Sequence, residues 1–177
     1  MDASRRQLLQ LAAIGAVTAL LPACGNQTVA KGDRFPDVAL PDLDGRITPF
    51  SAYSDVALVV NFWATWCEPC RREMPALEKL GTLFRPGDLR VIGVAVDSDV
   101  NLPREFGMRY KLTFPVLSDS KQAVTNGILR IPGFPATYLL RRDRTIARIV
   151  IGSQEWAEPK MLAEIEALLA VRRISAV

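Results

Sequence analysis

The chain contains no histidine among its 177 residues. This absence excludes hydrolases built on Ser-His-Asp or Cys-His arrangements, because both need an imidazole as the general base. It also excludes haem attachment through a C-x-x-C-H motif and every metal site that depends on histidine ligands. Any chemistry in this protein must therefore use other side chains.

Cysteine is scarce as well, with only Cys24, Cys67 and Cys70. A structural zinc site needs about four nitrogen or sulfur ligands, and three cysteines without histidine do not complete one. The formal net charge is +3, from 22 Lys and Arg against 19 Asp and Glu. That near balance gives no reason to expect a nucleic-acid partner. We therefore expect no metal, no bound cofactor and no nucleic acid.

The composition that is present is that of a folded domain. Hydrophobic residues make up 49% of the chain and charged residues 23%, which is unlike a disordered sequence. The length suits one domain with a sizeable core.

Residues 1–23 have the pattern of an export signal peptide. Arg5 and Arg6 precede an apolar stretch at 8–21, which as a helix would span roughly 21 Å, short of the roughly 30 Å hydrocarbon core of a bilayer. An export signal therefore fits better than a permanent span. The residues around Arg5 and Arg6 resemble a twin-arginine signal, and an ordinary signal is the alternative; either one places the mature chain outside the cytoplasm.

Cys24 ends a segment that resembles a bacterial lipobox, in which the cysteine is diacylated and the chain is cleaved before it. This resemblance predicts a lipoprotein on the periplasmic side of a membrane. The lipidated Cys24 and a short tether would occupy 24–32, and a folded domain 33–177. The alternative is cleavage by an ordinary signal peptidase, with Cys24 lost or left free.

The mature chain shows an alternation of strand and helix patterns. Asp44-Gly45 between two apolar runs indicates a hairpin, continuous apolar runs indicate strands buried on both faces, and apolar residues at helical spacing indicate helices. The elements expected after the hairpin are a strand at 56–63, a helix at 70–84, a strand at 89–96, a helix at 103–110, an extended segment at 115–117, a weak helix at 120–129, strands at 136–140 and 146–151, and a helix at 157–171. This order predicts an α/β fold.

Three arginines, Arg141, Arg142 and Arg144, lie in the turn between the last two expected strands. We expect them to be solvated, with docking to an acidic partner as the alternative.

The most informative motif is Trp66-Cys67-Glu68-Pro69-Cys70, between the first buried strand and its helix. Two thiols at this spacing can close into a redox-active disulfide. At a helix N-terminus, free N–H groups and the helix dipole favour a thiolate at Cys67, which is the reactive form. Cys70, one turn further on, can resolve a mixed disulfide. Pro69 suits the first turn, where its missing N–H costs nothing.

Glu68 bears on the direction of electron flow. An acidic neighbour opposes the thiolate at Cys67 and so lowers the reduction potential, which favours a reductant over a strong oxidant. Alternatively, Glu68 is simply a solvated acid in the first turn of the helix.

Taken together, these residues resemble the thioredoxin superfamily, and most closely its ResA/TlpA group of extracytoplasmic thiol-disulfide oxidoreductases. Three segments carry the resemblance: 59–75 around the two cysteines, 42–45 in the hairpin, and 133–140 at a strand start. The resemblance implies a thioredoxin-like fold, with a central mixed sheet flanked by helices and an N-terminal β-hairpin.

The resemblance also implies roles within the site. Cys67 would be the attacking thiol and Cys70 the buried resolving thiol. Pro135 would be a cis-proline facing the disulfide, because proline gives the only inexpensive cis peptide. Phe134 would offer backbone polar groups to an extended substrate, and Trp66 would shield the disulfide.

Proton handling falls to Glu73, which matches the acid that ResA-like proteins carry three residues after the second cysteine. There it is thought to tune the thiols and assist proton transfer, whereas an ordinary exposed helix glutamate is the alternative. Asn61 stands where cytoplasmic thioredoxins carry a buried acid. Asp97, at a strand end, is expected to act as a cap.

The expected function is reduction of disulfides in exported proteins by a membrane-tethered enzyme that a membrane thiol reductant recharges. The resemblance implies apocytochrome c as the substrate, with assembly of a copper oxidase site close behind. One alternative is a peroxiredoxin-like thiol peroxidase, although that family needs Thr or Ser where this chain has Ala64. Another is a Sco-like copper chaperone, although those proteins use C-x-x-x-C and a histidine.

Overall fold

The structure, a computed structural model, describes residues 29–174. The predicted signal peptide, Cys24 and the first part of the predicted tether lie outside the described residues. No helix within 29–174 is long and apolar enough to cross a membrane.

A five-stranded mixed sheet forms the centre of the domain, in the order β5-β4-β3-β6-β7. The central strand β3 (Ala57–Trp63) pairs in parallel with β4 (Leu89–Ala95), and β4 in parallel with β5 (Val116–Ser118). On its other side β3 pairs antiparallel with β6 (Ala136–Leu140), which pairs antiparallel with β7 (Ile146–Ile151). The predicted mixed sheet is therefore confirmed.

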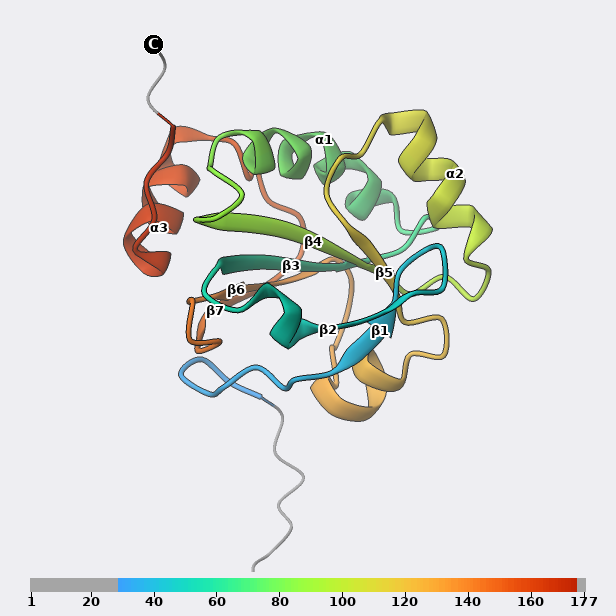
Figure 1. Ribbon diagram of the computed structural model, residues 1–177. Helices are drawn as coiled ribbons and strands as arrows, with labels where there is room; N and C mark the ends of the chain where they lie inside the picture. Colours follow the sequence, from blue (N-terminus) through green and yellow to red (C-terminus); the bar gives the residue numbers. More distant parts are fainter. Residues whose placement is uncertain (1–28, 175–177) are drawn as a thin grey trace, which may run out of the picture.

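Three helices cover one face of the sheet: α1 (Glu68–Thr82), α2 (Asn101–Tyr110) and α3 (Pro159–Leu169) (Figure 1). The predicted helix at 70–84 begins two residues earlier, because Cys67 is the N-cap and Pro69 fits the first turn. The helix predicted from 157 begins only at Pro159 and ends before Ala170, whose left-handed backbone closes it.

The opposite face carries shorter elements. The predicted hairpin is formed by β1 (Ala39–Pro41) and β2 (Ile47–Pro49), followed by a 3-10 turn, η1 (Phe50–Tyr53). The weak helix predicted at 120–129 is instead a π-helical turn, η2 (Ala123–Leu129). Its start is fixed by the buried carboxylate of Asp119, which accepts hydrogen bonds from the backbone amides of residues 124 and 125.

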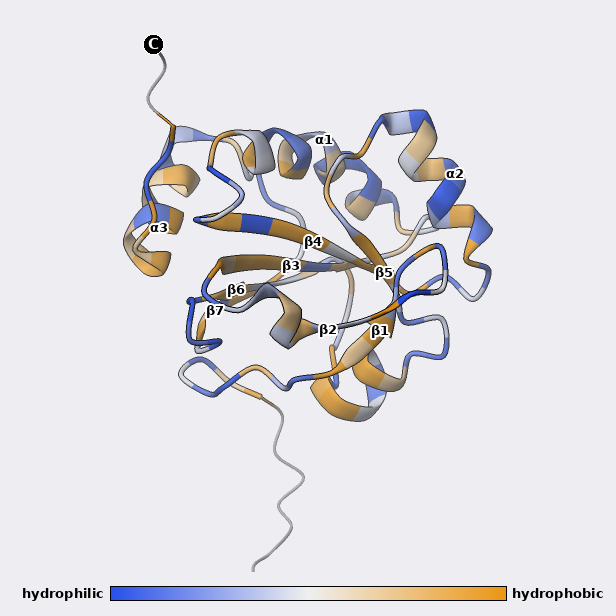
Figure 2. Ribbon diagram, in the orientation of Figure 1, coloured by the Kyte–Doolittle hydropathy of each residue, from blue (hydrophilic) through white to orange (hydrophobic). Residues whose placement is uncertain are grey.

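The alternation of side chains along β3 divides the core in two. Val59 and Trp63 belong to the cluster beneath the three helices, whereas Val60 and Phe62 belong to the cluster on the hairpin side. Figure 2 shows mostly hydrophobic colours along β3 and β4, each interrupted by a short hydrophilic stretch. Asn61, completely buried, lies on the helix face of this strand because it is two residues from Val59 and Trp63.

The turn between β6 and β7 differs from the prediction in one respect. Arg144 is buried, with 8% of its surface exposed. Arg142 is also engaged, because its guanidinium donates to the backbone oxygens of Asp55 and Gly87 and pairs with Asp88 at 2.8 Å. The expectation of a fully solvated turn is therefore wrong for Arg144.

Candidate active site

Cys67 and Cys70 form a disulfide at the N-terminus of α1, with Cα atoms 5.3 Å apart. Cys67 is the N-cap residue, and its sulfur accepts a hydrogen bond from the backbone N–H of Cys70 at 3.4 Å. The exposed fraction is 7% for Cys67 and 0% for Cys70. Of the two cysteines, only Cys67 therefore has surface that a partner can approach without opening of the fold.

An aromatic pair from two separate segments lies beside the disulfide. Trp66 is 61% exposed, and its ring meets that of Phe134 edge to face, with centroids 6.0 Å apart. Phe134 packs against the core cluster that contains both cysteines. The Phe134–Pro135 peptide is cis, as the resemblance implies. Trp66, the residue before Cys67, therefore presents an exposed apolar surface, and the partly buried Phe134 borders it.

Glu68 is solvent-exposed and forms an ion pair with Arg72, one turn further along α1. This neighbouring cation offsets the negative charge of Glu68. Its effect on Cys67 is therefore smaller than the sequence suggested.

Glu73 is buried inside the domain, with 3% of its surface exposed. One carboxylate oxygen accepts a hydrogen bond from the side-chain amide of Asn61 at 2.8 Å. The other accepts from the indole N–H of Trp156 at 2.9 Å and from the backbone N–H of Gln154 at 3.0 Å. Glu73 is thus not an ordinary exposed helix glutamate.

Comparison with known proteins agrees with this arrangement. Residues 31–149 match the model of the AhpC/TSA family. Thiol-disulfide oxidoreductase ResA of Geobacillus thermodenitrificans is 32% identical over 146 residues, which cover 82% of this chain and 83% of that protein. The chain belongs to the ResA-like thiol-disulfide oxidoreductases of the AhpC/TSA family.

Two further proteins resemble this ResA-like oxidoreductase. Thioredoxin-like protein YneN of Bacillus subtilis is 32% identical over 141 residues, covering 78% of this chain and 81% of that protein. A secreted Mycobacterium tuberculosis disulfide oxidoreductase, homologous to E. coli DsbE, has a similar fold with a TM-score of 0.63. It is 22% identical, and the match covers 75% of this chain and 96% of that one.

Burial governs the acidity of Glu73 in this ResA-like protein. Removal from water raises the pKa of Glu73 above its ordinary value, and the hydrogen bonds from Trp156, Gln154 and Asn61 oppose that rise. A carboxyl group balanced in this way can gain and lose a proton at a pH closer to neutrality than an exposed glutamate.

Asn61 reaches Glu73 because of strand register. Asn61 of β3 lies opposite Thr137 of β6, and its amide nitrogen donates to the Thr137 hydroxyl at 2.9 Å as well as to Glu73. Among residues 29–174, the Asn61 Oδ1 atom is buried without a hydrogen-bond partner. Turning this amide by 180° would present an acceptor to Glu73, so the same residue can serve either protonation state of the acid.

Asp97 was expected to cap a strand end. It is instead buried and stabilises the loop before Cys67. Its carboxylate accepts hydrogen bonds from the backbone N–H of Thr65, at 3.1 Å for the closer oxygen, and from the Thr65 hydroxyl. The loop continues with a hydrogen bond from the Cys67 N–H to the Ala64 oxygen at 3.2 Å. The sequence marked Asp97 only as a strand-end acid and gave no sign of this contact.

Trp156 and Gln154 are site residues that the sequence did not single out. They lie just before α3, more than 80 positions from Glu73. The available signal was Trp156 itself, because a buried indole usually needs an acceptor for its N–H. Within the described part of the chain, no group of three or more His, Cys, Asp or Glu side chains is placed to hold a metal.

Proposed function

We propose that this thiol-disulfide oxidoreductase reduces disulfides of exported proteins while tethered to the outer side of a membrane. The observation that carries the proposal is the inequality of the two sulfurs: Cys67 is reachable at the start of a helix, whereas Cys70 is fully buried. One thiol is therefore suited to attack a partner and the other to release it.

The reaction begins with the reduced enzyme. The Cys67 thiolate, favoured by the N-terminus of α1, attacks one sulfur of the substrate disulfide and displaces the other as a thiolate. The product is a mixed disulfide between Cys67 and the substrate. The substrate segment would lie along the Trp66–Phe134 surface and the backbone at Pro135.

The second step regenerates the enzyme disulfide. The Cys70 thiol must lose its proton before its sulfur attacks Cys67, and Glu73, three residues along the same buried helix face, is the proposed acceptor. The attack expels the substrate's second thiolate, so that the substrate leaves as a dithiol. A dithiol donor in the membrane then returns two electrons to the Cys67–Cys70 disulfide.

Glu73 also supports a reducing direction. When it is ionised, its buried negative charge opposes a thiolate at Cys70 and so stabilises the disulfide form. A disulfide that is favoured in this way gives a low reduction potential. Equilibration with a glutathione redox buffer tests this, and a potential near that of strong oxidants, about −120 mV, would contradict it.

The proposals of a membrane tether and of a particular substrate are based on the sequence. The lipobox-like segment at Cys24 supports lipid anchoring, the preceding residues support export, and one protein of similar fold is described as secreted. By family resemblance we propose apocytochrome c as the substrate. Radiolabelled palmitate incorporation into wild type but not Cys24→Ser tests the anchor.

The main alternative is a peroxiredoxin-like thiol peroxidase, since peroxiredoxins share this fold. The position before Thr65 is Ala64, which has no hydroxyl, and the Thr65 hydroxyl is bound to Asp97. We therefore expect slow turnover of hydroperoxide by the purified protein. Rapid turnover would favour the peroxidase.

The decisive experiment is trapping with Cys70→Ser. Without the resolving thiol, the mixed disulfide on Cys67 should accumulate, and mass spectrometry of the non-reduced adduct identifies the substrate. Cys67→Ser is the matched control, because Cys70 is buried and should trap little. Equal trapping by both variants would contradict the assigned roles.

A further inference from the structure

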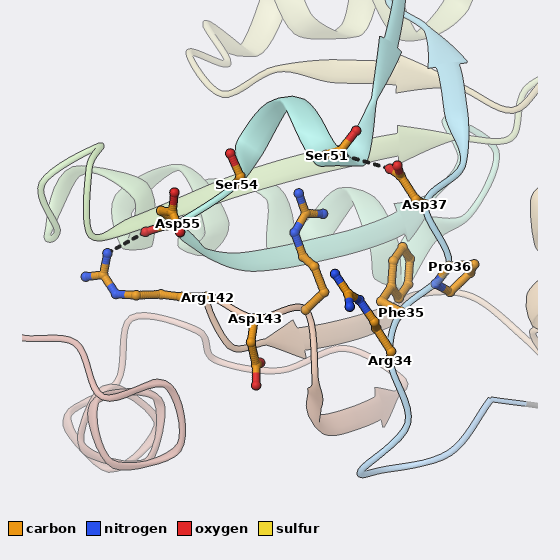
Figure 3. Close-up of a pocket in the computed structure, with 10 residues that line it drawn as sticks. Arg34, Phe35, Pro36, Asp37, Ser51, Ser54, Asp55, Arg142 and Asp143 are labelled. Atoms are coloured by element: carbon orange, nitrogen blue, oxygen red, sulfur yellow. Dashed lines mark hydrogen bonds between the residues drawn. The ribbon is translucent and has the colours of Figure 1, made fainter.

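A second polar site lies at the opposite end of the sheet from the disulfide. It is a cavity of about 550 Å³, lined by the segment 34–37, by the turn 142–144, and by Ser51, Ser54 and Asp55 (Figure 3). We call it the arginine cavity. The seven residues of β3 separate it from the Cys67 end of the sheet, a distance of about 20 Å.

Arg144 is the unusual residue of the arginine cavity. Its side chain makes no hydrogen bond or ion pair with any described residue, and its Nη2 atom is buried without an acceptor. Burial lowers the pKa of Arg144, the charge of Asp37 opposes that change, and the charge of Arg34 adds to it. A buried cation without a hydrogen-bond acceptor is costly, so this position calls for an anion.

The backbone gives a second reason to look for a function at this position. Arg144 has a φ of 71°, in the left-handed region that glycine enters without steric cost. The turn is closed by hydrogen bonds that do not use the Arg144 side chain, from the Arg144 N–H to the Arg141 oxygen and from the Thr145 N–H to the Asp143 carboxylate. Glycine would satisfy the turn better, so the turn does not explain the arginine.

The other charged residues of the arginine cavity are largely occupied. The guanidinium of Arg142 donates to the backbone oxygen of Asp55 and pairs with the Asp88 carboxylate. The Asp143 carboxylate accepts from a backbone N–H, and Figure 3 shows it pointing away from Ser51 and Ser54.

Asp37 accepts a hydrogen bond from the Ser51 N–H at 2.8 Å. Of the three carboxylates that line the cavity, Asp37 is the one whose charge acts on Arg144, which shares this part of the cavity with Arg34. The formal charges of the whole lining cancel, so selectivity must come from the placement of these two groups and not from net charge.

We propose that the arginine cavity binds a phosphate group through Arg34 and Arg144. Guanidinium groups form paired, charge-assisted hydrogen bonds with phosphate oxygens, and two of them on one cavity can contact different oxygens of the same group. The cavity is large enough for a phosphate carrying a small alcohol.

The position of the cavity suggests where the phosphate comes from. Residues 32–35 run along the same turn, with hydrogen bonds from Gly32 to Ile146 and from Phe35 to Arg144. Cys24 lies only five positions before Val29 in the sequence. If Cys24 is anchored as proposed above, this end lies towards the lipid, and a lipid headgroup is one source of phosphate; free phosphate is the other.

The test is thermal unfolding of the detergent-solubilised full chain at constant ionic strength. Two probes are titrated: inorganic phosphate and glycerophosphoglycerol, which is the phosphodiester headgroup of phosphatidylglycerol without its acyl chains. A ligand at about ten times its Kd should raise the Tm of wild type by about 3 °C. A response to the diester points to lipid, and a response to inorganic phosphate alone points to the free ion.

Arg144→Gly should abolish the rise with either probe, and it should fold well because glycine suits the backbone. Arg34→Gln should weaken the response. Arg141→Gln removes a charge from the same turn but outside the cavity, and Ala170→Gly relieves another left-handed residue; both should keep the full response. The proposal is overturned if neither probe raises the Tm of wild type, or if Arg144→Gly responds as wild type does.

Discussion

An ionisable side chain is buried at each end of the sheet, but the two side chains differ in their hydrogen-bond partners. At the disulfide end, Glu73 has both carboxylate oxygens occupied by three donors from separate segments. At the other end, Arg144 is almost as buried, yet the described residues offer it no acceptor. The protein itself supplies hydrogen-bond partners for Glu73, whereas a bound ligand would supply the acceptor for Arg144.

The difference indicates what each residue is for. A group that must exchange a proton with a neighbouring thiol needs fixed partners that hold it in place while its charge changes. A group that must bind an anion needs unoccupied donors, because an internal acceptor would compete with the ligand. Three variants test whether the two charged groups differ in this way.

The largest effect is expected from Glu73→Gln. Glutamine keeps the size of the side chain and can pair with a turned Asn61 amide, but it cannot take the proton of Cys70. We expect resolution of a mixed disulfide at neutral pH to slow about 100-fold. Stopped-flow measurement of thiol release from a Cys67-linked model peptide gives the rate.

Glu78→Gln is the control for this variant, because Glu78 belongs to the same helix but is only partly buried and binds Thr113. An unchanged resolution rate in Glu73→Gln would remove Glu73 from the proton-transfer step.

An intermediate effect is expected from Trp156→Phe. The change leaves one Glu73 oxygen with a single donor, so we expect the free energy of unfolding to fall by about 2 kcal/mol at neutral pH. The pKa of Glu73 should rise further, because the lost hydrogen bond was lowering it. Urea unfolding between pH 4 and pH 8 measures both effects.

The sign of the pH dependence is fixed by the direction of the shift. An acid whose pKa is raised by folding stabilises the protein most at low pH, and that stability is lost as the pH rises through the folded-state pKa. Trp156→Phe should therefore lose most stability relative to wild type at high pH. Trp66→Phe, at an exposed tryptophan, should change neither the free energy of unfolding nor its pH dependence. A loss of stability in Trp156→Phe that grew towards acid pH would contradict this interpretation.

The smallest effect is expected from Asp37→Asn at the arginine cavity. Asparagine can still accept the Ser51 N–H, but the charge that supports Arg144 is lost. We expect the free energy of unfolding in phosphate-free buffer to fall by about 1 kcal/mol. Added phosphate should recover part of the loss.

Asp33→Asn is its control, since Asp33 is exposed and makes a comparable backbone hydrogen bond. If Asp37→Asn is no less stable than Asp33→Asn, Arg144 does not depend on the charge of Asp37.

Much of the fold could be predicted from sequence because its signals are local. Apolar runs gave β6 and β7 at their observed bounds, and the Asp44-Gly45 pair gave the hairpin. The motif at Cys67 predicted a redox-active disulfide at a helix N-terminus, although apolar spacing placed the first helical residue two positions too late. The cis peptide at Pro135 and the importance of Glu73 came only from the family resemblance.

The remaining features depend on contacts between distant segments. Whether Glu73 is buried depends on α3 and on the residues before it, which supply Trp156 and Gln154. Arg144 belongs to a run of four charged residues that has every local mark of a solvated turn. Arg144 is buried because the segment 34–37 packs beside that turn, and the sequence around Arg144 does not indicate this contact.

The position of Trp156 also gives the protein an optical property. All three tryptophans of the chain, Trp63, Trp66 and Trp156, lie at the disulfide end of the sheet. Ultraviolet excitation of indole therefore gives emission from one end of the molecule only. Reduction of the disulfide or protonation of Glu73 should change the emission maximum and the fluorescence intensity. Binding of phosphate in the arginine cavity should leave both nearly unchanged.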